Sequence, residues 1–332
     1  CPSLSSTPSV RMLLAASPQL FTPVVAPPCP TPAAGSLAAA YPLEPHELAG
    51  PSAVQHACSL ERYLERQPLP PHTHDAFGEL TAWLDAAGER PLILDSGCGT
   101  GLSTRALALA HPQSLVLGVD RSGDRLGRRL GPHKTGKDAV PPNALLLRAE
   151  LATLWRMLQM SGRRVDHHLL LYPNPYPKPR QRGRRWHFHA SLPLLLALGG
   201  SLEVRSNWLP YLLEFRAAVQ AVAASPAAPP HVRQAAARKL PLGLTRASLP
   251  AAEDGLTLFE RKYWTSGEGL YRLASPGALE PVSGRVVRQY LEALGGRREV
   301  ARAAAESCAD GVAQTLKHGC TVYPFGWSKL RI

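Results

Sequence analysis

The sequence has 332 residues and a formal net charge of +12 at neutral pH, with a pI near 9.7. This length allows one large domain with extensions, or two domains. The positive charge favours an acidic partner such as nucleic acid, with generic solubilising charge in an arginine-rich proteome as the alternative. Because no run of about 18 apolar residues exists, we expect no membrane-spanning helix and no membrane partner.

The first 50 residues are rich in Pro, Ala and Ser and contain no acidic residue before Glu44. Such a stretch cannot bury enough apolar surface to fold alone, so residues 1–55 are expected to be a disordered or targeting extension. With Arg11 as its one basic residue, the stretch fits a transit peptide only weakly. The expected location is the cytoplasm, or a chloroplast or mitochondrion if the extension does direct import.

The six cysteines form no CxxC pair, and no histidine stands at zinc spacing from them. This pattern fits a reducing compartment and predicts neither a disulfide framework nor a metal site. His167 and His168 alternate across a predicted strand and therefore cannot share one face.

Apolar periodicity predicts alternating helices and strands from residue 74 onward. In chain order these are helix 74–87 with Thr73 as N-cap, strand 92–95, helix 101–110, strand 115–119, helix 124–130, strand 144–148, helix 151–160, strand 165–171, a helix from Trp186 that Pro193 interrupts, strand 201–205, helix 209–223, a flexible loop 224–233, and strands near 240–246 and 257–263. This βαβ alternation predicts an α/β fold with a seven-stranded, mostly parallel sheet and helices on both faces.

A glycine-rich turn follows the first predicted strand, which ends in a carboxylate. Glycines there let the backbone turn tightly and approach a ligand without a Cβ in the way. The next two strands also lead to carboxylates, and an acid after the second strand suits a ribose. The residues are Asp95, Gly97, Gly99, Gly101, Asp120 and Glu150. The order of an acidic glycine-rich turn, then Asp, then Glu resembles the S-adenosylmethionine site of the seven-stranded methyltransferases, whereas Thr100 breaks the GxGxxG spacing expected of NAD proteins.

The segment 172–185 (YPNPYPKPRQRGRR) follows an apolar run with the composition of a buried parallel strand. Its prolines forbid both helix and sheet at the carboxyl end of that strand, where open α/β sheets bind their ligands. The loop therefore brings the amide of Asn174 and the ring of Tyr176 toward the expected crevice. A basic cluster follows, consisting of Lys178, Arg180, Arg182, Arg184 and Arg185. This arrangement suits a flat heterocycle on a phosphate backbone.

Together these motifs resemble the tRNA (guanine-N7)-methyltransferases of the bacterial type. The loop 173–178 (PNPYPK) stands where the family has a Pro-Asp-Pro-Trp-like loop, and 206–211 (SNWLPY) where it has a Thr-Asp-x-x-x-Tyr-like segment. The stretch 257–262 (TLFERK) matches the family's Thr-x-Phe/Tyr-Glu-x-Lys motif in a late strand. The resemblance covers about residues 90–275. It implies a Rossmann-like class I methyltransferase domain over 56–278, acting as a monomer or homodimer.

Carried over residue by residue, the resemblance implies transfer of a methyl group from S-adenosylmethionine to guanine N7 in tRNA. It assigns the cofactor to Asp95, Asp120, Glu150 and the turn formed by Gly97, Gly99 and Gly101. Asn174 stands at the position of the family's active-site aspartate, which implies a catalytic role and a contact with the cofactor. Asn207 stands at the position of a second family aspartate, which implies a contact with the guanosine. The remaining residues expected at the guanosine or the RNA backbone are Tyr176, Lys178, Arg180, Arg182, Arg184, Arg185, Thr257 and Glu260.

The chemistry of guanine N7 tolerates an asparagine in place of aspartate. N7 carries a free lone pair, so no proton must leave before it attacks a methyl group, and catalysis can come from alignment and electrostatics. Asparagine keeps one acceptor oxygen and loses the charge. Charge-assisted hydrogen bonds contribute roughly 1.5–3 kcal/mol against about 1 for neutral ones, so a tenfold-order loss is expected rather than loss of function.

Two other hypotheses stay open. One is a catalytically weak RNA-binding pseudoenzyme that keeps the fold as a scaffold. The other is a methyltransferase for another RNA, a small molecule or a protein. With a small molecule or a protein as substrate, the basic loop should tolerate loss of Arg184 and Arg185. Residues 279–332 predict two helices. They are either an appendage that docks RNA or a protein, or a helical hairpin packed on the domain. The second basic group, Arg121, Arg125, Arg128, Arg129, His133, Lys134 and Lys137, is expected to be a solvated face.

Overall fold

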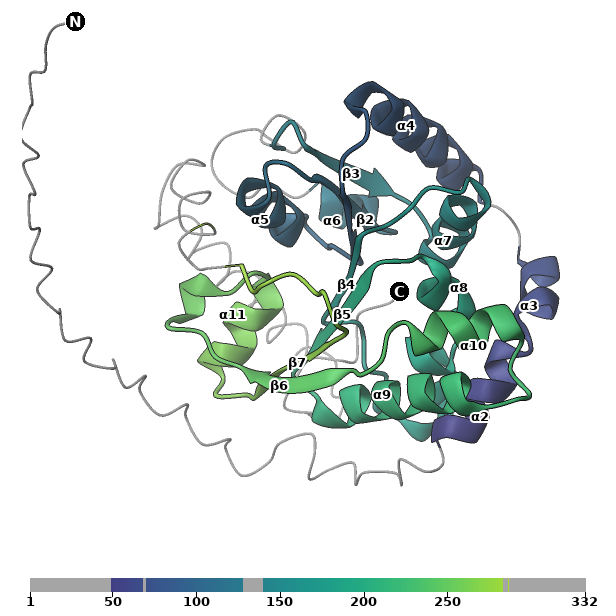
Figure 1. The fold of residues 1–332 in the computed structure, drawn as a ribbon. Coiled ribbons are helices and arrows are strands. Elements are labelled where there is room, and N and C mark those ends of the chain that lie inside the picture. The colour runs from purple at the N-terminus through teal and green to yellow at the C-terminus, as the bar shows by residue number, and fades with distance from the viewer. Residues whose placement is uncertain (1–48, 68–69, 128–139, 283–285, 287–332) are drawn as a thin grey trace, which may run out of the picture.

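The computed structural model describes residues 49–67, 70–127, 140–282 and 286 (Figure 1). Its strands are β1 (Leu92–Ser96), β2 (Leu115–Asp120), β3 (Ala144–Arg148), β4 (His167–Leu171), β5 (Ser201–Ser206), β6 (Gly243–Ala247) and β7 (Leu270–Ala274). Its helices are α2 (Ala49–Ala57), α3 (Leu60–Arg66), α4 (Pro71–Ala87), α5 (Leu102–Ala110), α6 (Gly123–Leu126), α7 (Leu151–Met160), α8 (Leu192–Ala197), α9 (Leu209–Ala224), α10 (Pro230–Ala237) and α11 (Leu258–Thr265). Short 3-10 turns are η2 (Pro179–Arg184), η3 (Trp186–Phe188) and η4 (Ala252–Asp254).

The seven strands form one sheet in the order β3-β2-β1-β4-β5-β7-β6. The first five strands in this order pair in parallel, while β7 runs antiparallel to both β5 and β6. The central strands β1, β2 and β4 are buried on both faces, which explains their mostly apolar sequences. The predicted Rossmann-like class I methyltransferase fold is confirmed by this order and by the single reversed strand.

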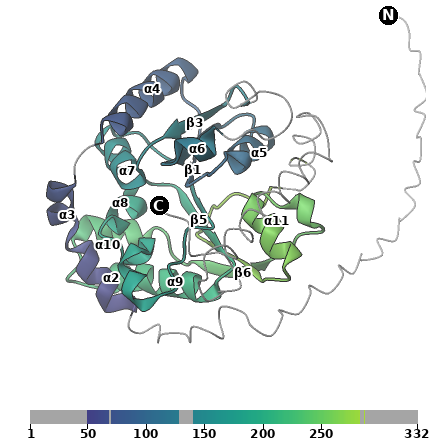
Figure 2. The same cartoon turned by 180° about the vertical axis from the view of Figure 1, so that it is seen from behind.

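Helices cover both faces of the sheet, as Figures 1 and 2 show from opposite sides. On one face α2, α4, α7, α8, α9 and α10 pack around a core that includes Leu94, Leu117 and Trp155. On the other face α5 and α11 pack around Ile93, Val116 and Leu169. Alternate residues of each strand serve opposite cores, as the period of two in a strand requires.

Several predicted bounds shift for identifiable reasons. Helix α4 begins at Pro71, since proline suits the first turn of a helix. Thr73 is therefore not the N-cap. Its buried hydroxyl instead accepts a hydrogen bond of 3.1 Å from the backbone N–H of Glu150. Pro193 likewise lies in the first turn of α8 rather than interrupting a helix from Trp186, which belongs to η3.

Two segments predicted to lack helix are helical. Residues 224–233, expected as a flexible surface loop, lead into α10 from Pro230, with Ala228 and Val232 in the core. The predicted strand at 257–263 is helix α11, and the last strand lies further on, at β7. The Thr257 hydroxyl accepts from the Glu260 N–H, and the Glu260 carboxylate accepts from the Thr257 N–H, which is a capping box that starts a helix.

The predicted domain boundary after residue 55 falls inside α2. This helix begins at Ala49, packs along α9 and buries Ala53 and Ala57 in the core. The structured domain therefore starts earlier than expected. The two helices predicted within 279–332, and the basic residues between 128 and 137, lie outside the described residues. No helix in the described part of the chain is long and apolar enough to cross a membrane.

Candidate active site at the carboxyl edge of the sheet

The carboxyl ends of β1, β2, β4 and β5 meet at one edge of the sheet. The strand pairs are in register, with Asp95 beside Gly118 and Leu171 beside Arg205. The ladder between β4 and β5 extends past its end, since the Tyr172 N–H donates to the Arg205 carbonyl. The antiparallel β7 begins at this same edge. As a result, the glycine turn, the loop after β4 and the segments flanking β5 and β7 are neighbours, as the sequence predicted for the first two.

The glycine turn presents an open backbone. Gly97, Gly99 and Gly101 have φ of 80, 61 and 73°, in the region that L side chains rarely adopt. A Cβ at Gly97 or Gly99 would meet nothing within 4 Å, so this backbone faces free space. A Cβ at Gly101 would instead lie 2.7 Å from the Leu146 side chain. The first two glycines thus leave room for a ligand, and the third leaves room for β3.

Asp95 is fully buried under this turn. Its Oδ2 accepts hydrogen bonds from the hydroxyls of Ser103 (2.6 Å) and Thr104 (2.8 Å) in α5. Its Oδ1 is buried without a hydrogen-bond partner among the described residues. Burial raises the pKa of Asp95 to about 6, and the two hydroxyls offset only part of that effect. A buried carboxylate oxygen with no partner is an acceptor available for a cationic group.

Asp120 and Glu150 end their strands as predicted, and both already hold backbone groups. Asp120 is 4% exposed, and it accepts from the N–H of Gly99 at 3.0 Å and from that of Ser122 at 2.8 Å. It therefore fixes the glycine turn of the neighbouring strand. Glu150 is half-buried and caps α7 by accepting from the N–H groups of Ala152 and Thr153. Both carboxylates lie at the edge where the resemblance assigns them to the cofactor.

The loop after β4 has an unusual backbone. Tyr172 and Tyr176 have φ of 55 and 43°, and such conformations in bulky residues cost about 1–3 kcal/mol each unless their surroundings impose them. Asn174 lies between them, and its Oδ1 accepts from the Tyr176 N–H at 3.1 Å. That bond uses one lone pair of the amide oxygen to shape the turn. Asn174 and Tyr176 are both partly exposed.

Arg185 does not occupy the position predicted for a contact with RNA. Its side chain is 4% exposed and pairs with Glu214 of α9 at 2.5 Å. The same guanidinium donates to the carbonyls of Pro175 and Tyr176. The prediction that Arg185 binds the RNA backbone is therefore wrong for this structure, because its guanidinium is buried and bonded to Glu214 and to the carbonyls of the loop. Glu214 also accepts from buried His187 at 3.0 Å.

The other cations of the cluster divide by exposure. Arg182 packs over the Phe188 ring at 4.4 Å, and its side chain is 25% exposed, 3.9 Å from Glu214. Arg180 and Arg184 are exposed, and Lys178 is half-buried. Arg184 lies 5.7 Å from the centre of the Tyr176 ring, within the range of a cation–π contact. The exposed part of the predicted basic cluster is thus Arg180 and Arg184, on the outer side of the loop.

Arg121 was predicted to be part of a solvated face, and its side chain is exposed. It directly follows β2, and its charge acts on Tyr176. Burial raises the pKa of the Tyr176 hydroxyl, and the charges of Arg184 and Arg121 lower it. Arg184 of η2 therefore lies over this ring, and Arg121, directly after β2, acts on the hydroxyl through its charge. A basic residue directly after the strand that ends in Asp120 was the available sequence signal.

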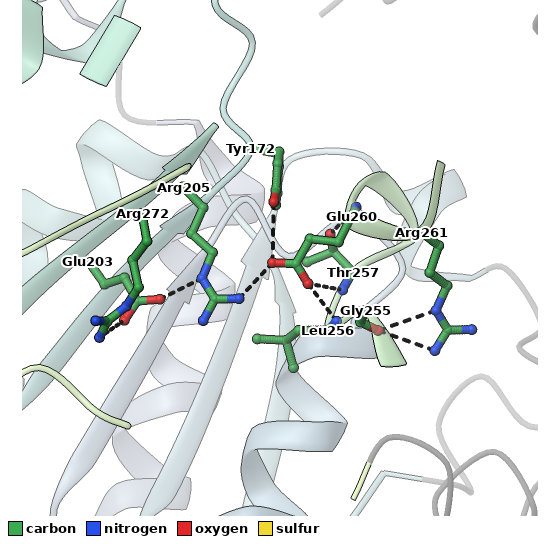
Figure 3. A network of polar contacts seen from close by, with 9 residues as sticks. All are labelled: Tyr172, Glu203, Arg205, Gly255, Leu256, Thr257, Glu260, Arg261 and Arg272. Carbon is green, nitrogen blue, oxygen red and sulfur yellow. Dashed lines mark hydrogen bonds and ion pairs between the residues drawn. The ribbon is translucent and has the colours of Figure 1, made fainter. Parts of the chain in front are cut away.

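Thr257 and Glu260 belong to a buried polar network, drawn in Figure 3. Arg205 donates to Glu260 and to Glu203 at 2.6 Å each, and the Tyr172 hydroxyl donates to Glu260 at 3.3 Å. Glu260 is 1% exposed and also accepts the N–H of Leu256 at 2.6 Å. With its oxygens so occupied, the predicted role of Glu260 at the guanosine is wrong here. The network instead ties α11 to β5 and to the loop after β4.

Asn207 lies at the end of β5 as predicted and has a partner that the motifs did not include. Its Nδ2 donates to Oε2 of Glu268 at 3.1 Å. Glu268 precedes β7, is half-buried, and is held by a bond from its N–H to the Tyr263 carbonyl. Among the described residues no cluster of His, Cys, Asp and Glu is placed to hold a metal ion.

The strand order defines a Rossmann-like class I methyltransferase fold, and an open glycine turn lies at the carboxyl edge of its sheet. Residues 89–231 match the protein family described as putative methyltransferase. The curated tRNA (guanine-N(7)-)-methyltransferase of Thermus thermophilus is 30% identical over 141 residues, 42% of this chain and 41% of that protein. Its counterpart in Treponema pallidum is 28% identical over 199 residues, 59% of this chain and 71% of that protein. The resemblance drawn from the motifs is therefore confirmed.

These matches are partial. The protein of the same description from Acidithiobacillus ferrooxidans is 29% identical over 147 residues, 43% of this chain and 61% of that protein. The chain thus spans about half the length of the curated relatives it matches. Among solved structures, the 16S rRNA methyltransferase KamB is 20% identical with a TM-score of 0.36, over 64% of this chain and 96% of that one. A likeness of that size adds nothing to the strand order, which defines the fold.

Proposed function

We propose that this chain transfers the methyl group of S-adenosylmethionine to N7 of a guanine in tRNA. The observation that carries the proposal is the shared edge of β1 and β4. There the open glycine turn lies over the buried carboxylate of Asp95, whose Oδ1 has no hydrogen-bond partner among the described residues. The neighbouring loop after β4 presents the amide of Asn174 and the ring of Tyr176. The similarity to curated guanine-N7 methyltransferases supports the choice of substrate.

The residues present fit S-adenosylmethionine. The orphaned Oδ1 of Asp95 and the open backbone at Gly97 and Gly99 suit an amino-acid group, with its ammonium near the carboxylate. Asp120 after β2 suits a ribose, although it would have to share its oxygens with the Gly99 N–H. When bound, the cofactor supplies an electrophilic methyl group on a sulfonium. The chain's task is then to bring the guanine to that methyl.

Orientation rather than proton transfer is what the loop after β4 provides. Guanine N7 needs no general base, and the described edge contains no histidine poised to be one: His168 lies within β4 and is 1% exposed, and burial lowers its pKa to about 3. Asn174 can hydrogen-bond the base with the second lone pair of Oδ1 and with its N–H groups. The ring of Tyr176 offers a stacking face, which contributes about 1–3 kcal/mol per base.

The first experiment is to incubate the purified protein with labelled S-adenosylmethionine and unmodified tRNA and to map the product by cleavage at 7-methylguanosine. Label at one guanine is the expected result. Asp95→Ala should abolish it, because the buried acceptor is lost, while Glu89→Gln, an exposed carboxylate at the opposite end of β1, should not change it.

The alternatives give different results in the same assay. A pseudoenzyme would bind tRNA and yield no label, and Asn174→Asp would then create activity from none. A methyltransferase for a small molecule would bind cofactor and leave every tRNA unlabelled. The exposed pair Arg180 and Arg184 separates these two, because only an RNA-binding protein should lose RNA affinity when both become alanine.

A further inference from the structure

A carboxylate outside the predicted motifs lies at the substrate end of the site. Glu268 is half-buried at the start of β7, and one of its oxygens, Oε2, accepts from the Asn207 amide at 3.1 Å. The bond leaves Oε1 of Glu268 and the amide oxygen of Asn207 as acceptors, with a second N–H on the asparagine. An amide and a carboxylate held side by side present a donor next to acceptors.

The strand order places this pair on the side away from the cofactor. Along the carboxyl edge, Asp120 follows β2, the glycine turn follows β1, Asn174 follows β4, Asn207 follows β5 and Glu268 precedes β7. Neighbouring strands are about 4.8 Å apart, so Glu268 lies roughly two strand spacings beyond the strand that carries Asn174. With the methyl donor over the glycine turn after β1, a purine that turns N7 toward it can point its Watson–Crick edge toward β5 and β7.

We propose that Glu268, oriented by Asn207, binds the Watson–Crick edge of the target guanine and selects guanine over other purines. The carboxylate would accept from N1–H and from the exocyclic N2 amino group, and the free N–H of Asn207 would donate to O6. This inference rests on the proposed function, because it assumes that a guanine occupies the crevice. In this proposal Glu268, just before the neighbouring strand β7, supplies the negative charge that Asn207 lacks.

The surroundings of Glu268 suit such a role. Burial raises its pKa, while the Asn207 amide and the charge of Lys262 on α11 lower it. Tyr263, on the same helix, has its own pKa raised by burial and by the charge of Glu268. A half-buried carboxylate with a single amide partner keeps acceptor capacity that a fully paired one, such as Glu260, has lost.

The test compares guanine with inosine, which lacks only the N2 amino group. Two tRNA transcripts are made that differ in guanine or inosine at the mapped position, and kcat/KM for methyl transfer is measured with native protein, Glu268→Gln and the exposed control Glu89→Gln. Native protein and the control should prefer guanine by about tenfold or more. In Glu268→Gln that preference should fall to within about twofold, mainly because kcat/KM for the guanine transcript decreases.

A merely structural role for Glu268 would lower transfer to both transcripts equally, and an unchanged guanine-to-inosine ratio overturns the proposal. Binding of guanosine and inosine monophosphates, followed by NMR, gives a readout that does not need transfer. If native protein methylates neither RNA, the proposed function fails. Selective binding of the guanine nucleotide that Glu268→Gln abolishes would still support the base contact, and equal binding of both nucleotides would refute it.

Discussion

Burial of Asp95 should make the folded protein less stable at neutral pH than a variant with a neutral side chain. The pKa of Asp95 rises from 3.8 to about 6 on folding, chiefly through burial. The unfolded chain therefore releases this proton first as the pH increases. Stability associated with the protonated carboxyl is complete below 3.8 and is lost as the pH rises through about 6. Above that range the folded state holds an ionised carboxylate in an unfavourable place.

The size of the effect follows from the shift. About two pKa units correspond to roughly 3 kcal/mol, since each unit is about 1.4 kcal/mol. At pH 8 nearly all of this penalty applies, and at pH 5 roughly half does. Asp95→Asn keeps an acceptor for the Ser103 and Thr104 hydroxyls and removes the charge. Any packing cost of the new amide is the same at both pH values and cancels in the comparison.

The assay is urea unfolding of native protein and Asp95→Asn at pH 5 and pH 8, followed by tryptophan fluorescence. The free energy of unfolding of the variant relative to native should increase by about 1–2 kcal/mol between the two pH values. Asp75→Asn, an exposed carboxylate on α4, should show no such change. A variant-to-native difference that does not depend on pH would refute the reasoning. Added S-adenosylmethionine should raise the Tm of native protein and not that of Asp95→Asn.

Three further outcomes follow from the packing around the site. Arg185→Ala should lower the free energy of unfolding by about 3–5 kcal/mol in urea, because it removes the guanidinium closest to the buried Glu214 carboxylate, which keeps the hydrogen bond from His187 and the more distant Arg182; a loss below about 1 kcal/mol would contradict the clamp. Replacing exposed Arg180 and Arg184 together with alanine should leave stability within about 0.5 kcal/mol and reduce the salt dependence of tRNA binding by about two phosphate contacts, whereas an unchanged slope would exclude them from the interface. Gly118→Ala should lower the Tm, with a stability loss of about 1–3 kcal/mol or more, because its Cβ would lie 2.3 Å from a side chain of α5; an unchanged melting curve by circular dichroism would show that α5 can move.

The parallel half of the fold was predictable because its signals are local. Short apolar strands, a glycine turn and amphipathic helices recur in order, so β1 to β5 and the glycine turn fell at or near the predicted residues. The strand prediction at 257–263 failed because Thr, Phe and Tyr have strand propensity, while the competing signal was a Thr-x-x-Glu capping box. There a hydrogen-bonding motif of four residues outweighed composition.

The basic loop shows a different limit of sequence reasoning. Arg184 and Arg185 are adjacent and chemically identical, yet one is exposed beside Tyr176 and the other is buried against Glu214. The difference arises from Glu214 on α9, which pairs with Arg185 and lies 29 positions away from it in sequence. Composition therefore predicted a basic cluster correctly but overestimated how much of it faces outward. The charge of Arg185 contributes to the site by fixing the backbone of Tyr176, whose positive φ needs that support.

The two asparagines that the motif resemblance aligns with family aspartates are not equivalent, and this leads to a last prediction. Asn207 lies 3.1 Å from Glu268, so Asn207→Asp would place two carboxylates in contact and raise the pKa of one of them strongly. Asn174 has the Tyr176 N–H as its partner, which a carboxylate would also satisfy. We therefore expect Asn174→Asp to retain or increase methyl transfer, and Asn207→Asp to reduce it about tenfold at pH 7.

In the Glu268→Gln background the sign should reverse, because Asn207→Asp then restores a single charge beside an amide. A double-mutant cycle on kcat/KM measures this directly, with the two changes coupled by about 1–3 kcal/mol. Additive effects would show that Asn207 and Glu268 do not share one ligand. If coupling is found, Glu268 just before β7 supplies the carboxylate that the family has at the end of β5, where this chain has Asn207. The chain then retains a negative charge for the guanine, in a different residue.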